Sequence, residues 1–258
     1  MVFSKSLTIK TLILSVFLFG ASSISKAAQV DILLMYGGNA KRLVESNTDV
    51  SIETYLYFLV DSANDVYQDN GLDITLNVVA IADELSYYNP VPSTWWGEQL
   101  QNWRVQRALR QQYRADAVVF IGAPNGRQCG VAPGVAVGNN GQLDLRNANF
   151  AYNITAVGCG VSTFIHELGH NMGLNHNLAS GHRGGVFSYG VGYGVRNEFA
   201  TIMAYESVYN APRLPFFSNP RNTQCLGLPC GVEGRADSVR ALQPVIDTFA
   251  SFAEYLYD

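Results

Sequence analysis

The sequence contains few charged residues, few histidines and few cysteines. Charged side chains make up 15% of its 258 residues, and there are only four histidines and four cysteines. Low charge together with 12% aromatic residues excludes an intrinsically disordered protein, because disordered chains are rich in charge and poor in aromatic side chains. There is no internal repeat or low-complexity run, which excludes a repeat protein. A well-packed folded chain is therefore expected.

Long apolar runs are confined to the N-terminus. Lys5 and Lys10 precede an apolar run over residues 11–20, and Ser25-Lys26-Ala27 forms a small-x-small site. This pattern predicts a secretory signal peptide over residues 1–27, cleaved after Ala27. An uncleaved anchor is the alternative, but the apolar run is shorter than the about 20 residues that span a bilayer. We expect a secreted or periplasmic protein with no membrane attachment after signal removal.

Positive charge is scarce in the rest of the chain. Beyond the predicted signal there are 14 basic and 21 acidic side chains, which gives a formal charge of −7. This balance argues against nucleic acid and anionic membranes as partners. Residues 28–258 are enough for one domain with an ample core, and we expect a monomer. A strand predicted at 30–36 follows the cleavage site so closely that we expect no prodomain.

Four cysteines in an exported chain favour two disulfides over free thiols. Three pairings are possible, and we favour Cys129 with Cys159 and Cys225 with Cys230. A zinc site at Cys225 and Cys230 is the alternative for the second pair, but no neighbouring Cys or His completes a tetrahedral set.

Three of the four histidines lie within one segment, residues 166–176, with the sequence HELGHNMGLNH. On an α-helix, residues four apart share a face about 6 Å apart, so His166 and His170 can bind one ion. Gly173 can adopt the left-handed conformation that ends a helix, so the chain can turn back and bring in His176. Three ligands leave one position of a tetrahedral zinc ion open to water, as catalytic zinc sites do.

Glu167 follows the first of these histidines, where it can reach water at the metal without binding the ion. We predict that His166, His170 and His176 bind one catalytic Zn²⁺ and that Glu167 is the general base. A chance match is the alternative for the shorter HExxH pattern, but Gly173 and His176 make the extended pattern far more specific. The fourth histidine, His182, is the only substitute for the third ligand.

The hydrophobic pattern predicts alternating strands and helices. Strands are expected at 30–36, 72–82 and 116–122, with helices at 40–70 and 96–114 between them. This order predicts an α/β fold with a largely parallel sheet. Two further strands are expected at 130–137 and 150–157, one of them at the sheet edge beside the cleft, where an extended peptide can add as a strand. We also expect Ser162 to cap the helix that carries the histidines, and a C-terminal helix over 235–257 interrupted at Pro244.

The extended histidine motif resembles that of the metzincin zinc endopeptidases. Residues 201–205, TIMAY, resemble the Met-turn of that group, in which the methionine, here Met203, forms an apolar floor beneath the histidines. Within the metzincins, the bacterial reprolysin-like proteases are the most similar. That likeness lies in residues 129–132, 158–160, 217–220 and 227–229 and extends over about residues 116–240.

This resemblance implies a metzincin-type catalytic domain, a mixed and mostly parallel twisted sheet with an active-site helix and a C-terminal helix. Two positions depart from the reprolysin pattern. Asn177 stands where reprolysins usually carry Asp, and Tyr205 is more similar to astacins and serralysins, where that tyrosine can approach the zinc or the reacting carbonyl oxygen. Tyr205 is thus a candidate catalytic residue, and a packed aromatic on the turn is the alternative.

These features together predict a zinc endopeptidase that acts on peptide or protein substrates. One alternative is a secreted binding protein on an inactive metzincin scaffold. The intact Glu167 argues against it, because a binding protein needs no general base. A second alternative is a toxin-like protease that acts on a single target protein.

Overall fold

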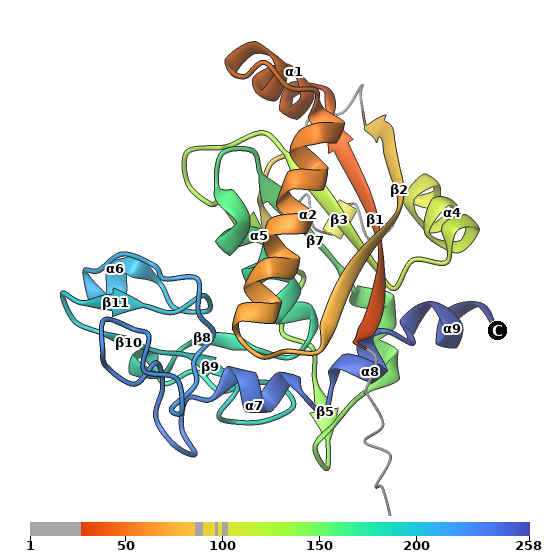
Figure 1. Cartoon of the computed structure of the whole chain (residues 1–258). Helices are drawn as coiled ribbons and strands as arrows, with labels where there is room; N and C mark the ends of the chain where they lie inside the picture. The colour runs from red at the N-terminus through yellow and green to blue at the C-terminus, as the bar shows by residue number, and fades with distance from the viewer. Residues whose placement is uncertain (1–26, 86–89, 96–97, 100–102) are drawn as a thin grey trace, which may run out of the picture.

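The computed structural model describes residues 27–85, 90–95, 98–99 and 103–258. The predicted signal peptide, apart from Ala27, therefore lies outside the described residues. A five-stranded sheet forms the centre, in the order β2-β1-β3-β7-β4 (Figure 1). Its strands are β1 (Ala28–Gly37), β2 (Ile74–Leu85), β3 (Ala117–Gly122), β7 (Tyr152–Ala156) and β4 (Gly130–Val131).

All neighbouring strands of this sheet are parallel except β4, which runs antiparallel to β7 at the edge. Every residue of β3 is buried, as expected for a parallel strand that is covered on both faces. The predicted α/β class with a mostly parallel sheet is confirmed. The sheet edge also falls, as expected, on one of the two short strands that precede the histidine helix.

Helices cover both faces of the sheet, and alternation along β1 divides its side chains between them. Val30, Ile32 and Leu34 belong to the larger core, under α2 (Ile52–Asp69) and α5 (Gly160–Asn171). Leu33 and Met35 belong to a smaller core, in which Leu109 of α4 (Arg104–Tyr113) packs. The histidine helix α5 thus lies on the side of the sheet that has the larger hydrophobic core.

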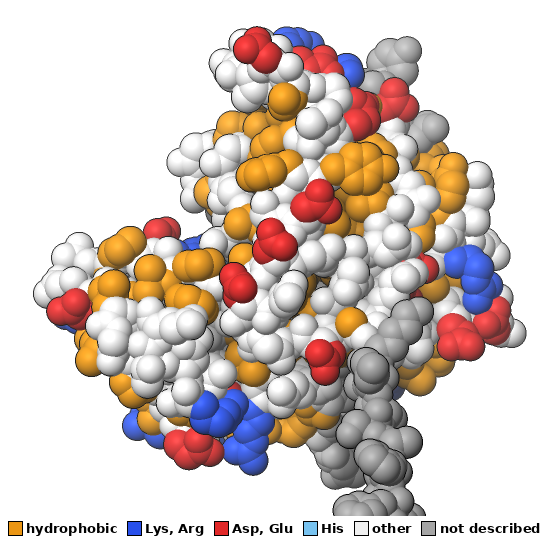
Figure 2. Space-filling view, viewed as in Figure 1, with side chains coloured by type: hydrophobic (Ala, Val, Ile, Leu, Met, Phe, Trp, Pro, Cys, Tyr) orange, Lys and Arg blue, Asp and Glu red, His pale blue; other side chains and the backbone are white. Residues whose placement is uncertain are grey.

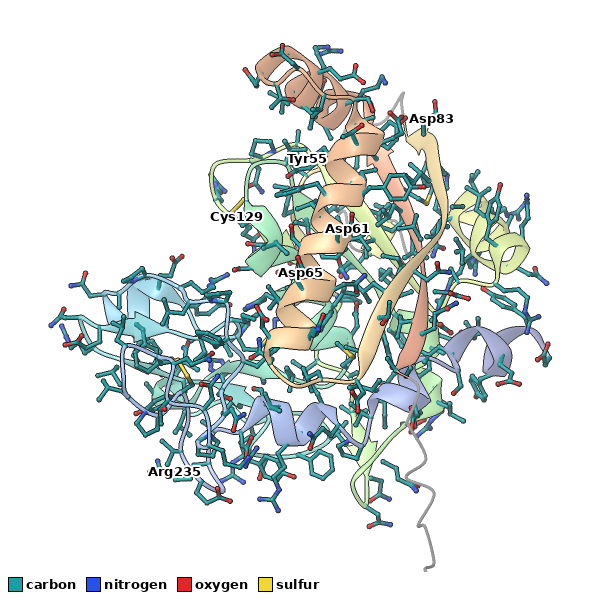
Figure 3. The ribbon with its side chains drawn as sticks, in the orientation of Figure 1. Tyr55, Asp61, Asp65, Asp83, Cys129 and Arg235 are labelled. Atoms are coloured by element: carbon teal, nitrogen blue, oxygen red, sulfur yellow. A yellow bond between two sulfur atoms is a disulfide. The ribbon has the colours of Figure 1, made fainter. Side chains whose placement is uncertain are left out.

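The amphipathic pattern of α2 gives it one buried face and one face in water. Its buried residues are Ile52, Leu56, Leu59, Val60, Ala63, Val66 and Tyr67. Acidic and hydrophobic side chains share the opposite face, where Figure 2 shows red and orange patches and Figure 3 labels Asp61 and Asp65.

The single helix predicted over 40–70 is wrong, because the structure has two helices, α1 (Gly38–Asn47) and α2. Thr48 is extended, and the hydroxyl of Ser51 accepts a hydrogen bond from the Thr54 N–H at 3.2 Å. Serine at an N-cap satisfies a backbone donor that a continuous helix would bond to a carbonyl. This cap starts α2 anew.

The helix predicted over 96–114 is shorter in the structure. Residues 96–97 and 100–102 lie outside the described residues, and Trp103 has extended backbone angles just before α4. The strand predicted at 130–137 shrinks to the two residues of β4, because Pro133 and Gly134 follow one residue later. The strand predicted at 150–157 is confirmed as β7.

The C-terminal segment forms three short helices. They are α7 (Ser238–Leu242), α8 (Ile246–Phe249) and α9 (Phe252–Tyr257). The predicted break at Pro244 is confirmed, and a second break at Ala250 and Ser251 was not predicted. None of the described helices is both long enough and apolar enough to cross a membrane.

The chain between α5 and α7 forms a lower lobe with little regular structure (Figure 1). It contains only short pieces: β8 (Asn175–Asn177), η2 (Leu178–Ser180), β9 (Val191–Gly192), β10 (Gly194–Val195), β11 (Phe199–Ala200) and α6 (Glu206–Tyr209). A small loop before α5 adds β5 (Gly138–Asn139), β6 (Gln142–Leu143) and η1 (Leu145–Phe150).

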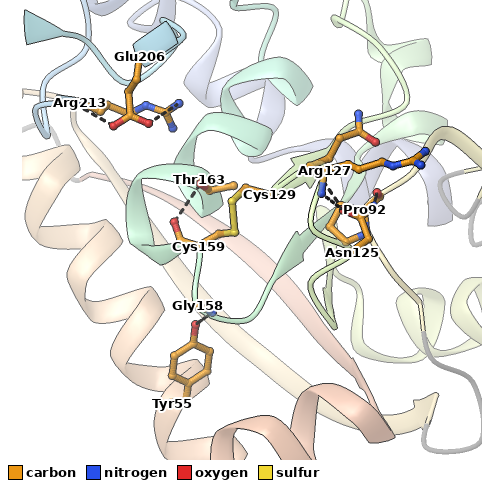
Figure 4. Close-up of a disulfide and its surroundings, with 11 residues drawn as sticks. Tyr55, Pro92, Asn125, Arg127, Cys129, Gly158, Cys159, Thr163, Glu206 and Arg213 are labelled. Carbon is orange, nitrogen blue, oxygen red and sulfur yellow. Dashed lines mark hydrogen bonds and ion pairs between the residues drawn. A yellow bond between two sulfur atoms is a disulfide. The ribbon is translucent and has the colours of Figure 1, made fainter. Parts of the chain in front are cut away.

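Both favoured cysteine pairings are confirmed, and no free cysteine remains. Cys129 precedes β4 and Cys159 precedes α5, so their disulfide joins the sheet edge to the start of the histidine helix (Figure 4). Cys225 and Cys230 are fully buried against Phe199 and fix the lower lobe.

The two disulfides should differ in their contribution to stability, because they close chain segments of different length. They span 30 and 5 residues. Loop-closure entropy gives ~3.7 kcal/mol for the longer loop and ~2.1 kcal/mol for the shorter. We expect the Cys129→Ala/Cys159→Ala pair to lower the free energy of unfolding more than Cys225→Ala/Cys230→Ala, measured by urea denaturation. The reverse order would show that packing of the lower lobe outweighs loop closure.

Candidate active site

The helix α5 carries two of the candidate ligands and ends abruptly after them. Residues 163–171 are all buried, an unusual state for a helix with two histidines and a glutamate. Gly173 has φ +89, the left-handed conformation predicted for it, and the chain reverses into β8, which carries His176. The reversal brings the third histidine back beside the other two.

The start of α5 differs from the prediction. Its N-cap is Cys159, not Ser162, which lies inside the first turn. The disulfide holds Cys159 in place, and Gly160 begins the helix with φ +75. The side chain of Ser162 does not cap the helix. The hydroxyl of Thr163 donates a hydrogen bond to the Cys159 carbonyl oxygen at 3.0 Å.

His166, His170 and His176 come together at the floor of a cleft. One ring nitrogen from each lies within 4.8 Å of the others, and Nε2 of His170 is 3.0 Å from Nε2 of His176. Among the described residues, this is the one group of three or more His, Cys, Asp or Glu side chains that could hold a metal ion. His182, the alternative third ligand, lies with its ring centre 5.4 Å from that of His176 and outside the group.

Backbone carbonyls orient two of these rings. Nδ1 of His166 donates to the Ile202 oxygen, and Nδ1 of His170 donates to the Leu174 oxygen, both at 2.8 Å. A proton on Nδ1 leaves the lone pair of Nε2 available to a metal. The residues present therefore fit a bound metal ion.

Burial keeps all three imidazoles neutral, which is the metal-binding form. Burial lowers the pKa of His166 well below its usual value, helped by the neighbouring His170. It lowers the pKa of His170 to about 4 and that of His176 to about 3. None of the three carries a proton on both nitrogens at neutral pH.

Glu167 is buried beside this group, with its carboxylate against the edge strand. Burial raises its pKa to about 8, while Arg213 and a hydrogen bond from the Ala132 backbone act in the opposite direction. Gly130 of β4 packs so closely that a Cβ there would collide with the Glu167 carboxylate. A buried carboxyl with a raised pKa can take up a proton near neutral pH, as a general base must.

The predicted Met-turn lies directly beneath α5. Met203 is fully buried, and its sulfur would lie 2.7 Å from a Cβ placed on Gly169. Gly169 therefore leaves the space that Met203 fills. Because Ile202 of the same turn accepts the hydrogen bond from His166, the turn both supports and orients the histidines.

Tyr205 stands at the mouth of the group. Its hydroxyl lies 2.8 Å from Nε2 of His176, and the residue is 40% exposed. Asn177, the departure from the reprolysin pattern, is fully buried and accepts a hydrogen bond from the Tyr205 N–H at 2.6 Å. Its own amide donates to Ser180 at 2.7 Å. Asn177 thus anchors the end of the Met-turn to the strand of the third histidine.

These side chains line a cleft of about 870 Å³ between β4 and the Met-turn. Gly130 and Val131 of β4 form one wall, so the sheet edge lies along the cleft as expected. The opposite wall includes Arg213, which sequence reasoning missed. It is the isolated cation in a Pro-Arg-Leu-Pro segment, and no motif pointed to it.

A family model described as metallo-peptidase family M12 matches residues 26–218. A peptidyl-Asp metalloendopeptidase of Pseudomonas aeruginosa is 34% identical over 94% of this chain and 44% of that protein. A peptidyl-Asp metalloendopeptidase of Xanthomonas campestris pv. campestris is 30% identical over 85% of this chain and 48% of that protein. The chain thus spans about half the length of these curated relatives.

A solved structure of a chaperone-substrate complex has a similar fold. It matches with a TM-score of 0.68 over 88% of this chain and 36% of that chain, at 19% identity. At this identity the likeness concerns the fold alone, and it agrees with the sheet and helices described above.

The contact between Gly130 and Glu167 can be tested by adding one methyl group. We expect Gly130→Ala to lower the free energy of unfolding by about 1–3 kcal/mol, because the new Cβ overlaps the buried carboxylate. Urea denaturation measures the loss. In a Glu167→Ala background the same substitution should cost much less, since the overlap is gone. An equal cost in both backgrounds would place the strain elsewhere.

The anchor at Asn177 can be tested in the same way. Asn177→Ala removes a buried acceptor from the Tyr205 N–H and should cost about 1–3 kcal/mol of stability. Asn177→Asp is the matched control, because it keeps an oxygen acceptor of the same size, and it should cost less. Thermal and urea unfolding measure both variants. Equal stability of Asn177→Ala and the unmodified protein would contradict the anchoring role.

Proposed function

Because this chain belongs to metallo-peptidase family M12, we propose that it is a secreted zinc endopeptidase that hydrolyses internal peptide bonds. One observation carries the proposal. Three neutral imidazoles converge beside a buried glutamate on the floor of an open cleft. The two disulfides support export, because such bonds persist in oxidising compartments.

His166, His170 and His176 are the proposed zinc ligands. The first two would bind through Nε2, because their Nδ1 atoms donate to backbone carbonyls. Three nitrogen ligands with an open position suit zinc better than hard, oxygen-preferring cations. A zinc ion held there would supply a Lewis acid that lowers the pKa of water toward ~7 and polarises a carbonyl group.

Glu167 is the proposed general base. It takes the proton of the attacking water and then delivers it to the departing amine nitrogen. Its burial supports this role, because a raised pKa, about 8 here, makes the carboxylate a stronger base toward a water proton. The Ala132 backbone and Arg213 stabilise the ionised form that must act first.

Tyr205 and the edge strand are proposed to hold the substrate. Burial raises the pKa of Tyr205, so its hydroxyl stays protonated and can donate a hydrogen bond to the oxygen of the reacting carbonyl. The backbone of β4 can pair with an extended peptide, which then crosses the cleft as a further strand.

The two relatives from Pseudomonas and Xanthomonas are peptidyl-Asp metalloendopeptidases. We propose the same preference here, for peptide bonds beside aspartate. An acidic substrate residue would have to find a positive partner in the cleft.

The proposal predicts a separation of metal binding from turnover. Glu167→Gln should keep about one zinc per chain, measured by plasma emission spectrometry, because it leaves the imidazoles intact. Its cleavage of casein should fall by about 10²–10⁴-fold, the usual contribution of a general base. Chelation of the metal should abolish cleavage by the unmodified protein, and added zinc should restore it. Full turnover in Glu167→Gln would remove its assignment as the base, and intact casein with the zinc-loaded protein would contradict the proposed function.

A further inference from the structure

We propose that Arg213 determines substrate specificity by binding the side-chain carboxylate of an acidic residue beside the scissile bond. The inference rests on the proposed endopeptidase function and assigns its preference to one side chain. It starts from the charges that line the cleft.

Four side chains of Arg and Glu line the cleft within the described part of the chain: Arg127, Glu167, Glu206 and Arg213. Arg127 and Glu206 are exposed at the rim, and Glu167 is the proposed base. Arg213 alone combines a positive charge with burial, since its side chain is only 16% exposed. A cation of this kind offers a site for an anion inside the cleft.

Arg213 is only loosely paired for a cation that is largely buried. Its Nε atom is buried and forms no hydrogen bond. Its ion pair with Glu206 is long, 4.0 Å from an Nη atom, and the Glu206 side chain is 57% exposed (Figure 4). Burial lowers the pKa of Arg213, which reflects the cost of keeping this charge out of water. A long ion pair to an exposed carboxylate compensates a buried charge poorly, so a substrate carboxylate at hydrogen-bond distance would stabilise Arg213 further.

The position of Arg213 puts such a carboxylate next to the reacting bond. Arg213 lines the same cleft as Glu167, His176 and Tyr205. A carboxylate bound by Arg213 would therefore share this cleft with the proposed base and a proposed ligand. The bound acid would therefore flank that bond.

The backbone around Arg213 is fixed before substrate arrives. Arg213 bridges Ala200 of β11, and the Leu214 N–H bonds to the Ala200 oxygen at 2.8 Å. The Arg213 N–H bonds to Glu206 at 3.2 Å, and prolines stand on either side at 212 and 215. A planar guanidinium held in this way can bind a carboxylate through two parallel hydrogen bonds. Lysine and arginine side chains of a substrate would be repelled.

The test compares two peptides that differ only in one Asp or Asn at a fixed position. With the zinc-loaded protein, kcat/KM should favour the Asp peptide, and Arg213→Leu should lower that ratio by about 30-fold or more, which corresponds to about 2 kcal/mol. Arg213→Lys keeps a cation without the planar fork and should give an intermediate ratio. Arg127→Leu, which removes an exposed cation that also lines the cleft, is the matched control and should keep the ratio.

A binding measurement separates this proposal from the proposed hydrolysis. Zinc-loaded Glu167→Gln should bind a fluorescent Asp peptide more tightly than the Asn peptide by fluorescence anisotropy. The preference should disappear in Glu167→Gln/Arg213→Leu. If the unmodified protein cleaves neither peptide but this preference holds, the role of Arg213 stands and the proposed function fails.

Two results would overturn the proposal. The first is an Asp preference that survives Arg213→Leu and Arg213→Lys. The second is an equal loss of kcat/KM on both peptides, which would mean that Arg213 supports Glu167 or the developing charge and does not select the substrate. Circular dichroism of Arg213→Lys, the less disruptive variant, shows that the comparison is made on folded protein.

Discussion

The structure of the site depends on satisfying the polar side chains of a helix that is buried almost throughout. Imidazole N–H groups taken out of water need acceptors, and two backbone carbonyls supply them. One belongs to Leu174, just past the helix end, and the other to Ile202 in the Met-turn. The irregular lower lobe therefore helps to form the site, because it places the Ile202 carbonyl oxygen 2.8 Å from Nδ1 of His166. Gly169 and Gly173 provide the space and the reversal that this path requires.

Much of the fold could be predicted from short-range patterns. Continuous apolar runs identified β1 and β3, alternation of apolar and polar residues identified β2, and Pro244 marked a real break. The short strand β7 was also predicted, within a Gly- and Asn-rich segment. The errors lie where one local interaction decides the outcome. The apolar periodicity over 40–70 hides the Ser51 cap that separates α1 from α2, and Ser162 lost the capping position to a cysteine fixed by a disulfide. The signal peptide, the domain limits at 28 and 258, the absence of a prodomain and the monomeric state stay predictions.

In the candidate site, too, some features could be predicted from local sequence and others could not. The spacing within residues 166–176 is enough to bring the histidines and Glu167 together, since helix geometry and one glycine determine it. Contacts across the cleft depend on the tertiary fold and left no local pattern. Three such pairs join residues 28 to 46 positions apart. They are Gly130 with Glu167, Asn177 with Tyr205, and Arg213 with Glu167. Asn177 was noticed as a departure from a family pattern, and only the structure gives it a contact.

The disulfide between Cys129 and Cys159 ties the wall of the cleft formed by β4 to the helix that forms its floor, because one cysteine leads into the edge strand and the other into α5. That wall cannot hinge away from the floor, so the covalent bond keeps the edge strand at a constant separation from Glu167 and the helix that carries it.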